Sequence, residues 1–133
     1  MTTPLHRCLA ALSLGSLLLC GCAFNVVYLT QRPATFTALS QEAKSFTLVA
    51  PAKVKVGTPF PVYLRDGTHW TQVGTTELGE VYNTKDQVLA VEGSNMHEAF
   101  LVVDGDQVVG FLLKVEKTFS SASQPVRIKI QKP

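Results

Sequence analysis

Two histidines and two glutamates are the first residues to consider for chemistry, because such side chains can bind a metal or transfer protons. His69 and His97 stand in separate segments, and neither has the His-x-x-x-His spacing of a metal site. Glu77 and Glu80 lie at a turn with Gly79, and their separation does not by itself make an acid–base pair. We interpret the histidines as surface residues of strands and the glutamates as solvated. The sequence therefore predicts no catalytic residue, no metal site and no cofactor.

The segment 65–70 reads Arg-Asp-Gly-Thr-His-Trp and contains the only tryptophan of the chain. Its Asp-Gly dipeptide is a strong turn signal, so the tryptophan stands beside a tight turn with two charges and an imidazole. Aromatic residues with polar neighbours are typical of protein interfaces. We therefore predict a partner-binding surface formed by Arg65, Asp66, His69 and Trp70. An alternative stays open, in which Trp70 covers an open end of the β-core.

The N-terminal segment is of a different kind from the rest of the chain. An apolar run over residues 8–19 follows Arg7, and the sequence Leu-Cys-Gly then stands directly before Cys22. This layout is typical of a secretory signal peptide, with its apolar core and its small-residue cleavage region. It also resembles the lipobox of bacterial lipoprotein precursors, in which Leu at −3 and a small residue at −1 precede an invariant Cys. The resemblance covers residues 1–22 alone.

The resemblance implies that residues 1–21 are a signal peptide and that residues 22–25 form a lipidated N-terminus and tether. Cys22 would carry the acyl chains, palmitate among them, and two or three chains hold a protein stably on a lipid bilayer. In lipoproteins an Asp after the Cys tends to retain the protein at the inner membrane. Ala23 stands there instead, which implies the outer membrane, with the domain in the periplasm. An uncleaved anchor and a soluble secreted protein are the alternatives, and Arg7 is a thin positive region for this class.

Removal of the first 21 residues leaves 112 of the 133, which is enough for one domain with a modest core. Of the 12 Lys and Arg one lies in the signal, so 11 remain against 10 Asp and Glu. This balance gives no electrostatic reason to expect nucleic acid as a partner. With Cys22 acylated no thiol is left for a disulfide or a metal. The domain must therefore be held together by packing alone.

From residue 26 to 131 the pattern is that of an all-β domain. Short runs rich in Val, Ile, Phe, Tyr and Thr alternate with turn residues every eight to twelve positions. Residues 37–44 are left open as a short helix or a loop, and two prolines mark residues 60–64 as an edge strand or an irregular one. We expect about seven or eight mostly antiparallel strands in a small β-sandwich or distorted β-barrel. The other expected strands are 26–30, 45–49, 69–76, 80–83, 87–91 and 125–131.

The clearest hairpin signal lies between Glu98 and Lys114. A two-residue loop at Gly105-Asp106 would pair Asp104 with Gln107, Val103 with Val108, Val102 with Val109 and Phe100 with Phe111. In this register Phe100, Val102, Val109, Phe111 and Leu113 share one face, and Ala99, Leu101, Val103, Val108 and Leu112 share the other. Both faces are apolar, which predicts a central hairpin covered on both sides.

For function, the leading hypothesis is a non-enzymatic envelope lipoprotein. It would be an accessory or scaffolding subunit of an envelope assembly, such as one for secretion or conjugation, with an envelope protein as its partner. The alternative is a ligand-binding or enzyme-inhibiting lipoprotein that uses the loop around Trp70. An enzyme ranks third, because no Gly-x-Ser-x-Gly motif or other catalytic constellation stands in the sequence.

Overall fold

The computed structural model describes residues 26–133, and every regular element in this range is a β-strand. Ten strands belong to one antiparallel sheet, and β4 and β5 make a separate pair. The predicted all-β antiparallel class is therefore confirmed. Twelve strands replace the seven or eight expected, because several are only two residues long. The strands are β1 (Arg32–Pro33), β2 (Thr37–Ala38), β3 (Ser45–Leu48), β4 (Ala52–Val54), β5 (Val62–Leu64), β6 (His69–Thr76), β7 (Gly79–Asn83), β8 (Ala90–Glu92), β9 (Met96–Asp104), β10 (Gln107–Leu113), β11 (Thr118–Arg127) and β12 (Ile130–Gln131).

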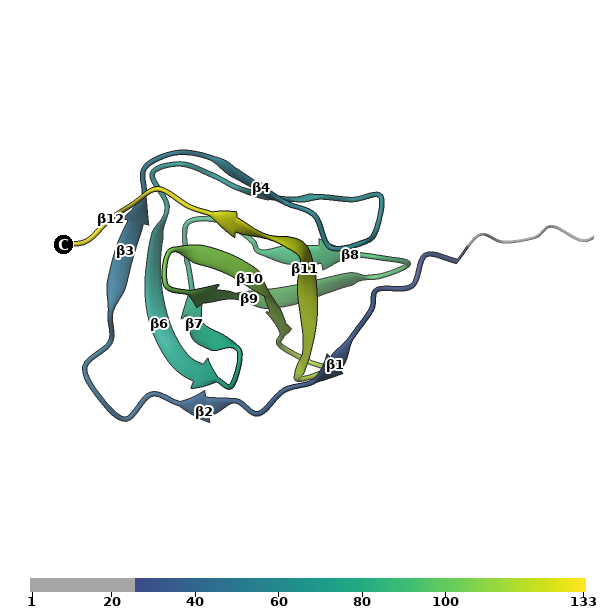
Figure 1. Ribbon diagram of the computed structural model, residues 1–133, viewed down its shortest axis with the longest axis horizontal. Helices are drawn as coiled ribbons and strands as arrows, with labels where there is room; N and C mark the ends of the chain where they lie inside the picture. The colour runs from purple at the N-terminus through teal and green to yellow at the C-terminus, as the bar shows by residue number, and fades with distance from the viewer. Residues whose placement is uncertain (1–25) are drawn as a thin grey trace, which may run out of the picture.

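The large sheet follows the order β1-β11-β10-β9-β7-β6-β3-β12, with β2 beside β6 and β8 beside β9. It curls on itself without closing into a barrel (Figure 1). After β11, which pairs with β10, the chain continues into β12, which pairs with β3 from Ile130 onward. β11 and β12 follow each other in the chain but lie on opposite sides of the opening that the sheet leaves. Two backbone bonds hold this crossing: Ile128 N–H donates to the Asp106 carbonyl and Val49 N–H donates to the Lys129 carbonyl, both at 2.9 Å.

Alternating burial along β6 shows why the sheet forms a core on its concave side. Trp70 and Gln72 are buried, whereas His69 and Thr71 are exposed, as expected for side chains that alternate across a strand, and a register shift follows before Gly74. The buried side chains of the concave face form the inner cluster. Its members include Phe46, Leu48, Val54, Leu64, Trp70, Tyr82, Val91, Leu101, Val103, Val108, Phe111, Leu113 and Ile128.

A smaller group, the outer cluster, lies on the convex face of the hairpin. It consists of Val81, Val102, Leu112 and Phe119. β1 and the residues after it cover this cluster: Ala34 packs against it, and the Arg32 guanidinium lies 5.0 Å from the Phe119 ring centroid. The central hairpin is therefore covered on both faces, as its sequence predicts.

The register of that hairpin differs from the prediction beyond its first two pairs. Gln107 pairs with Asp104 and Val108 with Val103 as expected, but a β-bulge then places Gly110, not Val109, opposite Val102. The predicted Val102–Val109 and Phe100–Phe111 pairs are wrong. A one-residue shift moves each following side chain to the other face.

The bulge also corrects the predicted faces of β10. Phe111 and Leu113 join the inner cluster together with Leu101, while Leu112 joins the outer cluster together with Val102. At Gly110 the backbone of β10 comes close to β11, and no side chain would fit between them. A Cβ added there would lie 2.4 Å from the Ser120 carbonyl oxygen.

The strand predicted at residues 26–30 is not formed. This segment is irregular, with Leu29 buried and Tyr28 exposed, and the first pairing begins at β1. Val27 is instead bound to a loop, because its carbonyl accepts bonds from both the backbone N–H (2.8 Å) and the hydroxyl (2.7 Å) of Ser94. Residues 37–44, left open as helix or loop, form β2 and a loop.

Two further strands differ from their predicted bounds. The closing strand predicted at 125–131 is the end of a longer element, since β11 already begins at Thr118, and β12 follows after a short break. The strand predicted at 87–91 starts later, at Ala90. Of residues 60–64, the first two are irregular, and Val62–Leu64 form β5, which pairs with β4 alone.

Candidate functional site

The predicted recognition segment contains a side chain that is not on the surface. Trp70 has no exposed surface and lies in the inner cluster, with its ring centroid 6.3 Å from that of Phe46. Its Nε1–H donates to the Thr68 hydroxyl at 2.8 Å, and that hydroxyl donates to the Arg65 carbonyl at 2.6 Å. The indole therefore ties the turn to the core, and it cannot serve as an exposed aromatic anchor.

The other three predicted residues, Arg65, Asp66 and His69, are exposed at this turn. The turn is held by the loop before β8, since Arg65 N–H donates to Gln87 Oε1 at 2.8 Å and His69 N–H donates to Asp86 Oδ2 at 2.6 Å. His69 Nδ1 also lies 2.7 Å from the Thr47 hydroxyl. His69 and Asp86 line a surface hollow of about 440 Å³. The segment thus offers a rigid polar surface.

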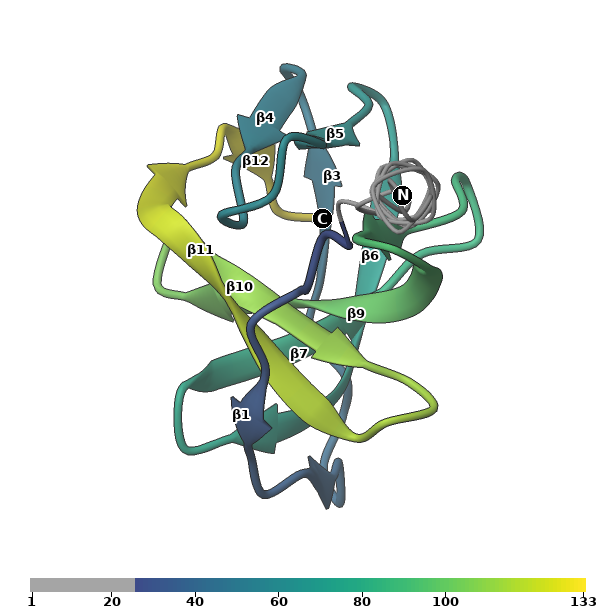
Figure 2. The ribbon, with the colours of Figure 1, turned by 90° about the vertical axis from the view of Figure 1, so that its right-hand side faces the viewer.

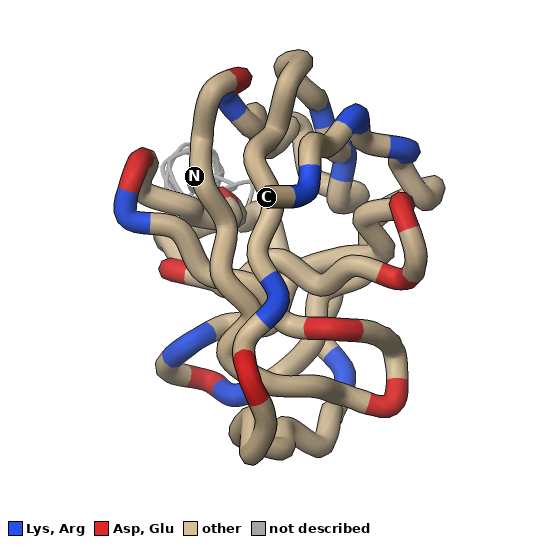
Figure 3. The backbone as a smooth tube through the Cα atoms, turned by 90° about the vertical axis from the view of Figure 1, so that its left-hand side faces the viewer, with Lys and Arg blue, Asp and Glu red and all other residues tan. Residues whose placement is uncertain are grey.

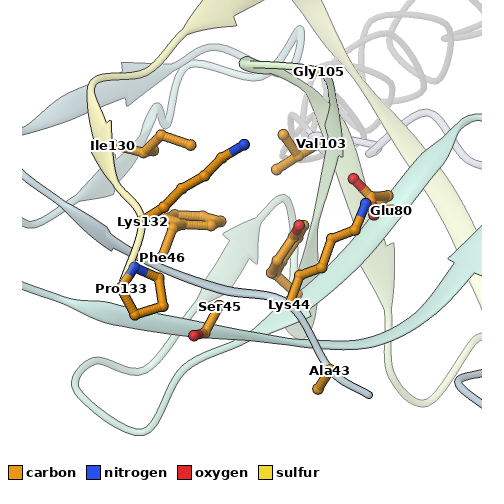
Figure 4. Close-up of a pocket in the computed structure, with 11 residues that line it drawn as sticks. Ala43, Lys44, Ser45, Phe46, Glu80, Val103, Gly105, Ile130, Lys132 and Pro133 are labelled. Carbon is orange, nitrogen blue, oxygen red and sulfur yellow. Dashed lines mark hydrogen bonds and ion pairs between the residues drawn. The ribbon is translucent and has the colours of Figure 1, made fainter. Parts of the chain in front are cut away.

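A second cavity, of about 390 Å³, lies at the opening of the curled sheet. We call it the mouth cavity. Figure 4 shows that its walls come from opposite sides of the opening: Phe46 and Ser45 from β3, Val103 from β9, and Ile130 with Lys132 at the C-terminus. Its lining is Ala43, Lys44, Ser45, Phe46, Glu80, Tyr82, Val103, Gly105, Ile130, Lys132 and Pro133. The incomplete closure of the sheet therefore leaves an apolar floor with charged groups around it.

An ion pair and a phenol set the electrostatics of the mouth cavity. Lys44 Nζ lies 2.9 Å from Glu80 Oε2, with the Lys44 side chain largely exposed. Burial, and then the nearby Glu80 carboxylate, raise the pKa of Tyr82 to about 12, so its phenol stays protonated at neutral pH. The Lys132 side chain extends into the cavity from the other side (Figure 4). Such a site can hold a ligand by apolar contact and by hydrogen bonds from the lysine ammonium groups or the Tyr82 phenol.

Sequence reasoning assigned no residue of the mouth cavity to a site: it interpreted Glu80 as solvated, and Val103 and Gly105 as parts of the hairpin. Lys44, Glu80 and Lys132 are far apart in the chain, and no local spacing connects them. The pairing of β3 with β6, β6 with β7 and β12 with β3 brings them together. The other glutamate, Glu77, accepts a bond from Thr35 N–H at 2.9 Å. The contacts of Lys44, Glu80 and Lys132 could have been predicted only from the order of the strands in the sheet.

The second histidine lies at an end of the central hairpin. His97 Nδ1 is 2.7 Å from Glu116 Oε1, and the hydrogen bond to His97 is the main reason that the pKa of Glu116 is lowered. Among residues 26–133, no group of three or more His, Cys, Asp or Glu side chains could hold a metal ion. Cys22 lies outside the described residues. The part of the chain that the structure describes also contains no helix long and apolar enough to cross a membrane.

Lys53 in β4 and Lys55 just after it lie beside β11. Ser123 N–H donates to the Lys55 carbonyl at 2.7 Å, and Lys53, Lys55 and Val126 line one shallow hollow. Arg127 lies 3.6 Å from Asp106, and both side chains are largely exposed. Figure 3 shows Lys and Arg gathered in the upper part of the molecule beside the C-terminus. This surface is solvated and basic.

Comparison of the chain with protein-family models, with curated protein sequences and with solved structures found no match.

Proposed function

We propose that the chain is the precursor of an envelope lipoprotein, acylated on Cys22, whose β-domain acts as a non-enzymatic accessory or scaffolding subunit at the outer membrane. The observation that carries this proposal is the Leu-Cys-Gly sequence before Cys22, placed at the end of an apolar run. The short spacing between this cysteine and the domain supports it, because Val27 and Leu29 are already packed on the domain.

Palmitate labelling of whole cells tests the anchor. Cys22→Ala should abolish the label and should release the protein from the membrane fraction or leave its signal uncleaved. The matched control is Cys20→Ala, which removes the neighbouring thiol and keeps a small residue within the cleavage region. It should label as the unaltered chain does. Label retained on Cys22→Ala would contradict the proposal.

The contacts of the mouth cavity support binding rather than catalysis. Its ammonium and carboxylate groups include a direct ion pair, Lys44 with Glu80, and its phenol stays protonated at neutral pH. An accessory subunit should co-purify with a defined set of envelope proteins from detergent extracts. Cross-linking in intact cells followed by mass spectrometry tests this, with the Cys22→Ala variant as the control for anchoring.

A second candidate function is a ligand-binding or enzyme-inhibiting lipoprotein. For this function the mouth cavity is a better binding site than the loop around Trp70. The indole is buried, whereas the cavity is open and lined by Phe46, Ile130 and Lys132. Such a protein should bind one soluble partner without detergent. Binding should weaken in Lys132→Glu and should persist in Lys85→Glu, which reverses the charge of an exposed lysine at the hollow of His69.

A further inference from the structure

Three segments that are distant in sequence meet at the end of the molecule where the described chain begins. Ser94, in the loop between β8 and β9, binds the Val27 carbonyl through its N–H at 2.8 Å and through its hydroxyl at 2.7 Å. Thr58, in the loop between β4 and β5, donates to the Glu92 carbonyl at 3.0 Å. Figures 1 and 2 show these two loops beside the segment that leads into β1. We call this surface the entry face.

The entry face exposes large apolar side chains. Within residues 26–133 nine such side chains are exposed, and four stand on these three segments: Val26, Tyr28, Phe60 and Met96. Tyr28 is 82% exposed and Met96 is 64% exposed. Single exposed apolar residues are ordinary, but several on adjoining loops mark a contact surface.

The length of chain before Val26 identifies what this surface faces. This step rests on the proposed function, because it takes Cys22 to be acylated and therefore held at the bilayer surface. Four residue steps separate Cys22 from Val26, and an extended chain spans at most about 3.3–3.6 Å per residue, or about 14 Å in all. The domain cannot turn its entry face far from the lipid.

We propose that the entry face rests on the bilayer, with Tyr28 and Met96 in the interfacial region and Val26 and Phe60 beside them. A tyrosine suits this position, because its ring is apolar and its hydroxyl stays hydrated. Contact would add apolar burial to the acyl anchor and would fix the orientation of the domain. The mouth cavity is lined by other segments and is left free for a protein or ligand.

Spin labels on the acylated full chain test this orientation. The mature protein has no free thiol once Cys22 is acylated, so Tyr28→Cys and Met96→Cys each introduce a unique labelling site. Val49→Cys is the matched control, since Val49 is also exposed but lies at the start of the connection from β3 to β4. Each protein is reconstituted in protein-free vesicles of phosphatidylethanolamine and phosphatidylglycerol, and the collision rates of the label with oxygen and with a water-soluble paramagnetic reagent are measured.

Labels at positions 28 and 96 should collide several-fold less with the water-soluble reagent than the label at position 49, and more with oxygen. If all three labels behave as fully aqueous on acylated, vesicle-bound protein, the entry face does not touch the bilayer and this inference is wrong while the anchor stands. Protection that occurs in native membranes and not in protein-free vesicles would assign the face to a protein partner and would also overturn it. Failure of the proposed function gives a different result, because a chain without palmitate would not bind the vesicles in any variant.

Discussion

Leu101 and Phe100 are neighbours on β9, yet they lie on opposite faces of the central hairpin and are covered in different ways. Leu101 has no exposed surface, because strands of the curled sheet surround the inner cluster. Phe100 is only half-buried: the Phe36 ring stacks on it at a centroid distance of 6.3 Å, and Lys114 Nζ lies 4.8 Å from its centroid.

The two faces differ in which part of the chain covers them. The inner cluster draws on strands from most of the chain, whereas the outer face is covered by residues 32–39, which carry the two-residue strands β1 and β2. Ala34 and Phe36 contribute side chains there. The described chain is packed on the domain even before this cover, since the Val27 carbonyl is bound by Ser94 and Leu29 is buried.

The largest effect should come from the inner face. Leu101→Ala removes a fully buried side chain and leaves a cavity, so the free energy of unfolding should fall by about 2–5 kcal/mol. Urea denaturation of the domain expressed from residue 23 measures it. Leu101→Met, which roughly conserves the volume, is the control and should cost less than about 1.5 kcal/mol. Equal losses for the two variants would show that Leu101 is not enclosed as described.

The β-bulge is the next point to test, because it decides which side chains of β10 belong to each face. At Gly110 a Cβ would lie 2.4 Å from the Ser120 carbonyl oxygen and 2.5 Å from the Phe119 ring. Gly110→Ala should therefore force β10 and β11 apart and destabilise the domain by about 1–3 kcal/mol. The control is Val109→Ala, at the adjacent half-buried position, which keeps the glycine. A Gly110→Ala variant as stable as the unaltered domain would mean that β10 and β11 are further apart at Gly110 than in this structure.

The sequence was sufficient for the class of fold and for most strands, but it was not sufficient for this register. Alternation in β6 is a local signal, so residues 69–76 were predicted with the correct bounds. The bulge depends on the approach of Ser120 and Phe119 to Gly110, and these residues lie on a strand whose first part carries few apolar side chains. The mouth cavity was also missed because it depends on contacts between distant segments. Lys44 and Glu80 come together only when β3 pairs with β6 and β6 pairs with β7. For Trp70 the sequence left two positions open, a partner-binding surface and a cover over the β-core, because the adjacent turn does not show that Thr68 offers the indole a buried acceptor.

The outer face should show a smaller loss than the inner face. Phe100→Ala removes a half-buried ring at the edge of the outer cluster, so we expect about 1–2 kcal/mol. Phe36→Ala should cost less still, and the double variant should lose less than the sum of the two, because the rings stack on each other. A neutral Phe100→Ala variant that no longer recruited an envelope partner would instead make the outer face the binding site.

The smallest effect should come from the end of the hairpin at which Glu116 is exposed. Glu116 lies 2.7 Å from His97, and this hydrogen bond lowers the pKa of the carboxyl. A lowered pKa in the folded state stabilises the protein above the ordinary glutamate range, and the contribution is lost as the pH falls through the folded pKa. Glu116→Gln should therefore cost less than about 1 kcal/mol at neutral pH, because the pair is partly exposed. The difference in unfolding free energy between the two proteins should vanish on acidification, and a constant difference down to low pH would assign the effect to packing and not to the charge.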